Sequence, residues 1–245
     1  MVLMMPLLFL FFLEPIHEIH LDRELNSIEI YNNKIYCAPR TGMSIFELTE
    51  SEDLHAISFT DDVNYRIYDF YVTPFAIYLN NGRSIEKFYF TSGVKETVYS
   101  ATDISSFILT PADEIILADH QMRELVFLDF TNSVKFKEPN ITIKDLQFVN
   151  GIIYTLTKKN IILFDEFGNI LGEKKIPEKL NHIFVEDADI FLFSPKKKYF
   201  YRFGDDWEKV EFLHGITDMC SNNQSIVILD GSGSYLYFYN KSRIE

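Results

Sequence analysis

Residues 144–177 read KDLQFVNGIIYTLTKKNIILFDEFGNILGEKKIP and contain four short apolar runs separated by three turn signals. The runs are residues 144–149, 152–156, 161–165 and 170–176, and Pro177 ends the last one. Asn150-Gly151 favours a tight type I′ hairpin, because both residue types tolerate positive φ angles. Short runs rich in β-branched and aromatic residues are typical of strands, so this stretch predicts a four-stranded antiparallel unit.

The same order of turns and strands recurs about every 36 to 42 residues. The first turn of each unit falls at Asn32-Asn33, Thr73-Pro74, Ala112-Asp113, Asn150-Gly151, Glu186-Asp187 and Asn222-Asn223. A fixed period of this length indicates a repeat architecture, because one unit is too small to bury its own apolar face and must stack on its neighbours. No run has helical period, so the sequence predicts an all-β domain.

The two ends of the chain indicate how the units are arranged. The sixth unit has three strands, residues 217–220, 225–229 and 235–239, before the chain stops. The alternating run PIHEIHL, Pro15 to Leu21, belongs to no hairpin of its own and could supply the missing strand. This would close a ring of six four-stranded blades and leave no long unpaired edge.

Composition excludes several classes of protein. The 245 residues include 23 Phe and 14 Tyr, which is ample material for a core, and the formal net charge is −13. Nucleic-acid binding needs a basic surface that releases counterions, so we expect no nucleic-acid partner. The acidic surface would instead attract cations or basic partners. We expect a monomer.

The two cysteines are too few for a disulfide framework or a multi-cysteine zinc site. Cys37 falls in the first unit and Cys220 in the last, and a closed ring makes these units neighbours. A single disulfide is one alternative, and two buried free thiols are the favoured one.

Residues 1–13, MVLMMPLLFLFFL, form an uncharged apolar segment. Thirteen residues are too few to cross about 30 Å of hydrocarbon as a helix. The segment is similar to the apolar part of an export signal, without the preceding Lys or Arg or the small-residue cleavage site. An export signal, a short membrane anchor and a segment packed on the domain are the alternatives. We expect an extracytoplasmic protein, secreted, periplasmic or membrane-anchored, in which residues 14–245 form one domain.

The second and third strands of two units carry a resemblance to a known family. Residues 113–119, DEIILAD, continuing through Arg123 to Asp129, are similar to the core of an NHL-type repeat, as are residues 151–154 with 162–168. The chain thus resembles a six-bladed β-propeller of the NHL and TolB-like type. It lacks the Trp-Asp dipeptides of WD40 repeats and the double glycine of kelch repeats.

The resemblance implies where a ligand would bind. In such propellers the innermost strands line a central channel, and ligands meet the face made by the loops that lead into strand one and those between strands two and three. The residues at these leading positions are Asp69, Asp103, Asp145, His182 and Asp218. A ring of carboxylates could bind Ca²⁺ or a cationic ligand. The favoured alternative is that each Asp bonds backbone amides of its own turn, because a residue that recurs in every unit is explained by a structural role.

Asp119 and His120 form a second candidate, a base with an orienting carboxylate. No Ser or Cys in a nucleophile motif accompanies them, and the histidine spacing fits no metal-binding motif. We therefore expect that Asp119 and His120 hold no metal and that the protein has no resident cofactor. If the ring of aspartates binds a cation, we expect that cation to be Ca²⁺.

Three functions follow from these patterns. The first is a non-catalytic propeller that binds a protein or a ligand. The second is a metal-dependent enzyme of the lactonase (hydrolase) or lyase kind at the channel mouth, which requires several oxygen ligands converging from different blades. The third is a structural subunit of a larger assembly. The geometry of the side chains around the ring axis separates the first two.

Overall fold

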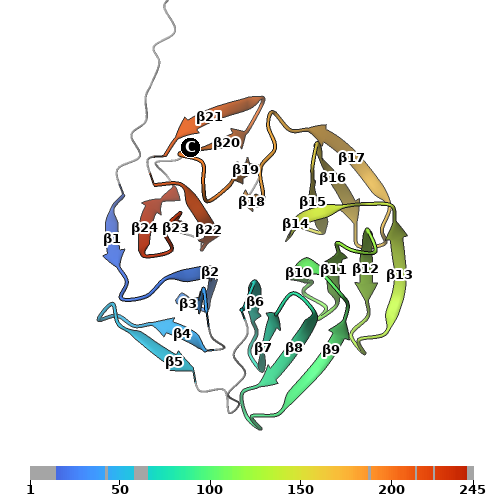
Figure 1. Ribbon diagram of the computed structural model, residues 1–245, viewed down its shortest axis with the longest axis horizontal. Helices are drawn as coiled ribbons and strands as arrows, with labels where there is room; N and C mark the ends of the chain where they lie inside the picture. The colour runs from blue at the N-terminus through green and yellow to red at the C-terminus, as the bar shows by residue number, and fades with distance from the viewer. Residues whose placement is uncertain are drawn as a thin grey trace, which may run out of the picture.

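The computed structural model describes residues 15–41, 44–57, 66–186, 189–212, 214–222 and 224–241. Their strands form six four-stranded antiparallel sheets arranged as blades around one axis, with β2, β6, β10, β14, β18 and β22 innermost (Figure 1). No α-helix occurs in these ranges. The chain is therefore an all-β, six-bladed propeller, as the turn pattern predicts.

The strand bounds follow the repeat. Blade 1 contains β2 (Leu25–Tyr31), β3 (Lys34–Pro39), β4 (Ile45–Leu48) and β5 (Leu54–Ile57), and blade 2 contains β6 (Asp69–Val72), β7 (Ala76–Asn80), β8 (Ser84–Tyr89) and β9 (Lys95–Ser100). Blade 3 contains β10 (Ile104–Leu109), β11 (Ile115–Asp119), β12 (Glu124–Leu128) and β13 (Val134–Pro139), and blade 4 contains β14 (Ile143–Val149), β15 (Ile152–Thr157), β16 (Asn160–Asp165) and β17 (Ile170–Lys175). Blade 5 contains β18 (His182–Glu186), β19 (Asp189–Phe193), β20 (Tyr199–Phe203) and β21 (Trp207–Glu211), and blade 6 contains β22 (Ile216–Ser221), β23 (Ser225–Asp230), β24 (Tyr235–Asn240) and β1 (His17–His20).

The N-terminal strand closes the ring. β1 pairs antiparallel with β24, with His17 opposite Phe238 and His20 opposite Tyr235. Ile19 and Leu21 are buried against the seam between blades 6 and 1. The prediction that the last blade takes its fourth strand from residues 15–21 is confirmed, and the closure leaves no unpaired edge on β24.

The hairpin turns have the backbone that the sequence predicts. Asn32, Asn33, Asn150 and Gly151 all have positive φ angles, between 50° and 79°, as a type I′ turn requires. Gly233, in the turn before β24, also has a positive φ, and a Cβ there would lie 2.3 Å from the Leu25 carbonyl oxygen. The turn of blade 6 therefore touches the backbone of blade 1 because residue 233 has no side chain.

The hydrophobic core lies between neighbouring blades. The cluster at the seam contains Cys37 and Leu25 from blade 1 with Cys220 and Leu229 from blade 6. Cys37 and Cys220 are both free and buried there, and burial raises the pKa of each thiol. The alternative of two buried thiols that pack as small hydrophobic side chains is the one observed.

The antiparallel order of the strands defines two faces of the ring. The upper face carries the loops that lead into each innermost strand and the hairpins between second and third strands. The lower face carries the hairpins between first and second and between third and fourth strands. Because β1 runs as a fourth strand, the chain enters the ring at the lower face, where the Ile16 amide donates to the Phe238 carbonyl oxygen.

Candidate functional site

One position of the innermost strand is polar in every blade. It is the residue that pairs with Ala38, Asn80, Ala118, Leu156, Phe193 or Leu229 of the second strand. The six residues are Ser27, Asp69, Ser106, Asp145, His182 and Asp218, and we call them the axial ring. The three aspartates therefore stand on alternate blades, 2, 4 and 6.

Asp218 joins the last blade to the first. Its Oδ2 accepts hydrogen bonds from the Ser27 hydroxyl at 2.7 Å and from the Ile28 amide at 2.8 Å. Its Oδ1 accepts the amide of Met219, the next residue on its own strand, at 2.8 Å. The inner edge of β2 would otherwise present an unpaired amide toward the axis, so the carboxylate covers a strand edge as well as linking two blades.

Asp145 links blade 4 to both of its neighbours by hydrogen bonds. Its Oδ1 accepts from the Ser106 hydroxyl of blade 3 at 3.0 Å, and its Oδ2 accepts from the Ile183 amide of blade 5 at 3.0 Å. The Leu146 amide donates to Oδ1 at 2.9 Å. The carboxylate thus bridges three blades.

Asp69 follows the same rule in blade 2. It accepts the Phe70 amide at 2.9 Å and also the Phe107 amide of blade 3. Each aspartate of the axial ring therefore bonds its own following amide, as the favoured interpretation of the sequence predicts, and in addition an amide of the next blade, which the sequence did not predict.

A second set of side chains, two residues further along the strands, repeats the pattern. The Glu29 carboxylate accepts the Val72 amide at 2.6 Å, and the Gln147 amide oxygen accepts the Val185 amide. Both bonds run from one blade to the next, so polar side chains on the inner strands serve mainly to close inner strand edges.

Two carboxyl groups of the axial ring, Asp69 and Asp218, have raised pKa values. Burial, followed by the charges of Asp218 and Asp145, raises the pKa of Asp69, against the effect of its amide donors. Burial raises the pKa of Asp218 to about 6, although the Ile28 amide and Ser27 hydroxyl favour its charged form. Burial also raises the pKa of Glu29. The proximity of several acids in a poorly solvated space explains these directions.

His182 is the one basic member of the ring. Its Nδ1 lies 3.5 Å from Asp145 Oδ2, and its side chain is 40% accessible. Burial lowers the pKa of His182, but the hydrogen bond and charge of Asp145, with the charge of Asp218, outweigh burial and leave the pKa raised. The imidazolium form therefore offsets part of the negative charge at the axis.

No group of three or more His, Cys, Asp or Glu side chains within the described ranges has the geometry to hold an ion. The aspartates stand on alternate blades, and at least one oxygen of each already accepts amide hydrogen bonds.

Asp103 lies outside the axial ring. The sequence had placed it at the same position of the repeat as Asp69, Asp145 and Asp218, and this prediction is wrong. Ser106 occupies the ring position of blade 3, opposite Ala118 and directly after a register shift that β2, β14 and β22 also have before their ring residues. Asp103 is three residues earlier, exposed in the loop that leads into β10, where its carbonyl oxygen accepts the His120 amide at 2.8 Å. Asp119 is buried and holds the β11–β12 turn by accepting the Met122 amide at 2.9 Å.

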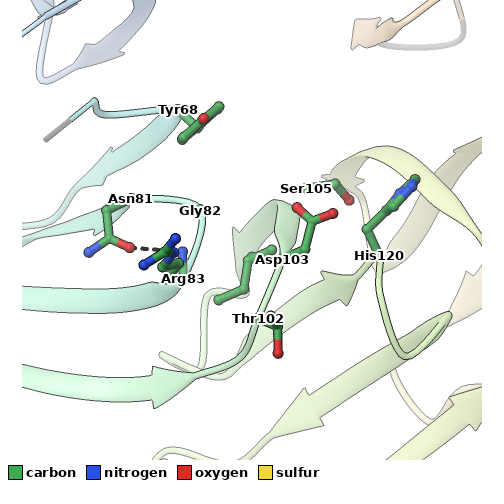
Figure 2. Close-up of a pocket in the computed structure, with 9 residues that line it drawn as sticks. Tyr68, Asn81, Gly82, Arg83, Thr102, Asp103, Ser105 and His120 are labelled. Atoms are coloured by element: carbon green, nitrogen blue, oxygen red, sulfur yellow. Dashed lines mark hydrogen bonds between the residues drawn. The ribbon is translucent and has the colours of Figure 1, made fainter.

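Asp103 and His120 instead line a pocket between blades 2 and 3 on the upper face (Figure 2). The pocket has a volume of about 460 Å³. It is lined by Tyr68, Asn81, Gly82, Arg83, Thr102, Asp103, Ile104, Ser105 and His120. These residues come from four loops, which are the segment before β6, the β7–β8 hairpin, the β9–β10 loop and the turn after β11, and from the start of β10.

The walls of the pocket are held by local hydrogen bonds. The Asn81 side-chain oxygen accepts the Arg83 amide at 2.9 Å, and the Asn80 side-chain oxygen accepts the Gly82 amide at 2.8 Å. On the other wall, the Ser105 hydroxyl donates to the Ile143 carbonyl oxygen at 2.9 Å. A Cβ at residue 82 would lie 2.9 Å from Tyr68 Cε2, so Gly82 allows the Tyr68 ring to close one side.

Asp103 and His120 were candidate residues from the sequence, whereas Tyr68, Arg83 and Ser105 were not. The sequence did contain a signal for Arg83. Asn81-Gly82-Arg83 forms the turn between β7 and β8, and this turn places a charged side chain on the face where the resemblance predicts ligand binding.

In sequence, no known protein family and no curated protein matches the chain. Solved propellers match its fold. A streptogramin B lyase is 10% identical with a TM-score of 0.65, over 92% of this chain and 97% of the other. A catalytically inactive histidine-to-alanine variant of virginiamycin B lyase from Staphylococcus aureus, solved with quinupristin, is 13% identical with a TM-score of 0.65, over 91% and 98%. The WD40 propeller domain of Doa1 is 12% identical with a TM-score of 0.64, over 89% and 80%.

At these identities the likeness shows the fold alone. The neighbours include an enzyme and a WD40 domain, so the fold supports a binding scaffold in general. The NHL-type resemblance of individual repeats stays a prediction. The described residues contain no helix that is long and apolar enough to cross a membrane.

Proposed function

We propose that this protein is a non-catalytic β-propeller that binds a small polar ligand in the pocket between blades 2 and 3. The main support for the proposal is the difference between the axial carboxylates and the upper-face pocket. The carboxylates at the axis already accept hydrogen bonds from neighbouring blades, whereas the upper-face pocket gathers Arg83, Asp103 and His120, all exposed, around a space of about 460 Å³. A concave site with a few convergent polar groups is the usual form of a ligand site.

The lining suggests the chemistry of the ligand. Arg83 offers a planar fork of donors suited to a carboxylate or phosphate, and Asp103 offers two acceptor oxygens. Tyr68 provides an aromatic wall. A small molecule with one anionic group and at least one hydroxyl or amine would satisfy these groups together.

A thermal-shift screen with small hydroxy acids, amino acids and sugar phosphates tests the proposal. Ligands that raise the melting temperature of the parent chain should lose at least tenfold in affinity in the Arg83→Ala variant. Lys159→Ala is the matched control, since Lys159 occupies the corresponding hairpin of blade 4 on the same face, away from the pocket. Equal loss in both variants, or binding unaffected by Arg83→Ala, would contradict the pocket assignment.

We also propose an extracytoplasmic or membrane-associated location. The support is the uncharged apolar sequence of residues 1–13, which lies outside the described residues, and the point at which the chain enters the ring on the lower face. Fractionation of the expressing cells, with detection of a C-terminal tag, tests this proposal.

A second candidate function is a lyase-like activity at the axis. The specific observation in its favour is His182, which contacts Asp145 and has a raised pKa, in a fold shared with a lyase that loses activity when a histidine is replaced. Incubation of the purified chain with quinupristin, followed by mass spectrometry, is the test. A product that the His182→Ala variant does not form would favour catalysis.

A further inference from the structure

Exposed aromatic and aliphatic side chains gather on the lower face over three consecutive blades. They lie at the hairpins between third and fourth strands, which all open at this face. The six residues are Phe90 and Val94 in blade 2, Phe130 and Val134 in blade 3, and Phe167 and Ile170 in blade 4. We call these residues the apolar arc. Phe130 is 72% and Phe167 76% exposed, which is unusual for phenylalanine.

Side-chain hydrogen bonds hold two hairpin tips of the arc, those of blades 3 and 4. In blade 3, Asp129 Oδ1 accepts the amides of Thr131 and Ser133 at 2.8 and 3.0 Å. In blade 4, Asp165 Oδ1 accepts the amides of Phe167 and Asn169 at 2.9 and 2.8 Å. Hydrogen bonds from the Thr131 hydroxyl to Asp129 and from the Asn169 side-chain amide to Asp165, together with these backbone bonds, lower the pKa of both aspartates. Each carboxylate is thus engaged in holding a turn that projects a phenylalanine outward.

The equivalent hairpins of the flanking blades have the opposite character. Blade 1 carries Glu50, Glu52 and Asp53 there, and blade 5 carries Asp205 and Asp206. An apolar hairpin tip is therefore not a requirement of the fold, and the arc is confined to one side of the ring, at blades 2 to 4.

Two observations indicate which surface would cover the arc. The chain enters the ring at the same lower face, immediately after the uncharged apolar sequence of residues 1–13. The arc also consists of separate projecting tips, and the described pocket lies on the other face. Separate apolar tips suit a fluid lipid surface, which closes around each side chain, better than a protein partner, which needs a continuous complementary area of about 800 Å².

We infer that the apolar arc seats the propeller on a phospholipid bilayer, with Phe130 and Phe167 inserted at the boundary between headgroups and acyl chains. The inference rests partly on the proposed membrane association, which it extends to a second contact besides residues 1–13. The acidic hairpins on either side predict a preference for zwitterionic over anionic lipid, because like charges repel.

Depth-dependent fluorescence quenching tests the inference on the full chain. A tryptophan introduced as Phe130→Trp is compared with Met122→Trp, a matched control that replaces a 60% exposed side chain of the same blade on the upper face. Vesicles of phosphatidylcholine, with and without bromine on the acyl chains, are added, and the signal of Trp207 in the parent is subtracted. The expected result is quenching at position 130 at least threefold stronger than at position 122.

The other outcomes overturn the inference in distinguishable ways. If the full chain pellets with vesicles but position 130 is quenched no more than position 122, residues outside the arc make the contact and membrane association survives alone. If neither the parent chain nor any variant sediments with the vesicles, both the proposed membrane association and the contact through the apolar arc are wrong. If the chain is a dimer by light scattering and Phe130→Asp makes it a monomer, a second copy of the chain covers the arc.

Discussion

Asp218 Oδ2 lies 2.7 Å from the Ser27 hydroxyl, although 191 residues separate the two in sequence. This bond and the adjacent bond to the Ile28 amide join the last blade to the first at the axis, while β1 joins them at the rim. The ring is thus closed at its inner and outer ends by two independent devices. The axial one uses aspartate, for which the sequence offered cation binding as the less favoured interpretation and backbone bonding as the favoured one.

Replacement of Asp218 by alanine should destabilise the whole ring. It removes three hydrogen bonds and leaves the Ile28 and Met219 amides unpaired, each at a cost of about 1–3 kcal/mol. We expect a loss of about 2–5 kcal/mol in the free energy of unfolding, measured by urea titration.

Asp218→Asn and Ser27→Ala provide the controls. An asparagine keeps an oxygen for the Ile28 amide, so we expect a loss of less than half that of alanine. A double-mutant cycle of Asp218→Ala with Ser27→Ala should show coupling of about 1 kcal/mol. Strict additivity would show that the bond does not contribute to stability.

Stability should rise as the pH falls from about 7.5 to 5.5. The pKa of Asp218 is about 6 in the folded state, above its usual value of 3.8, so the folded state binds protons that the unfolded state does not bind in this range. The pKa values of Asp69 and Glu29 are also raised. The raised pKa of His182 acts in the same direction, because the stability it contributes is lost as the pH rises through that pKa.

The raised pKa of Asp218 alone can change the free energy of unfolding by at most about 3 kcal/mol, because each pKa unit corresponds to about 1.36 kcal/mol. A melting temperature several degrees higher at pH 5.5 than at pH 7.5 is the expected result. Asp218→Asn should reduce this difference. A melting temperature that falls over the same range would show that the axial acids are not strained in their charged form.

Removal of β1 should unfold blade 6. A chain that lacks residues 1–22 loses the buried side chains of Ile19 and Leu21 and exposes the edge of β24. Burial of two such side chains contributes about 3–6 kcal/mol. A chain that lacks residues 1–13 keeps β1 and should retain its melting temperature by circular dichroism. Equal melting temperatures for the two truncations would contradict the closure.

Calcium should not stabilise the protein. Because the axial carboxylates accept amide and hydroxyl hydrogen bonds across the blades, 5 mM Ca²⁺ should change the melting temperature by less than about 1 °C. A saturable increase that Asp145→Asn abolishes would mean that a cation displaces those hydrogen bonds.

The period of turns predicted the fold because each turn is a local signal. Asn32-Asn33 and Asn150-Gly151 determine hairpins through their own backbone preferences. The closing strand was predictable as well, since a sixth unit with three strands and an unassigned run before the first unit fit each other.

The site was less predictable, because its contacts join residues of different blades. The groups that donate to Asp145 from other blades lie 38 and 39 positions away, at Ile183 and Ser106. The pairing of β10 with β11 places Ser106 in the ring, opposite Ala118, whereas matching of residue types had placed Asp103 there, three residues earlier. The pocket is likewise made by loops of two blades, and no single repeat contains its pattern.

The most direct test of the account is a map of ligand-induced NMR chemical-shift changes on the full chain, with a small hydroxy acid or sugar phosphate selected by thermal shift. The account predicts changes at the amides of Arg83, Asp103, Ser105 and His120, with Ile183 and Ile28 unchanged. Changes centred on His182, Asp145 and Asp218 would contradict it, since the axis would then be the binding site and its carboxylates more than links between blades.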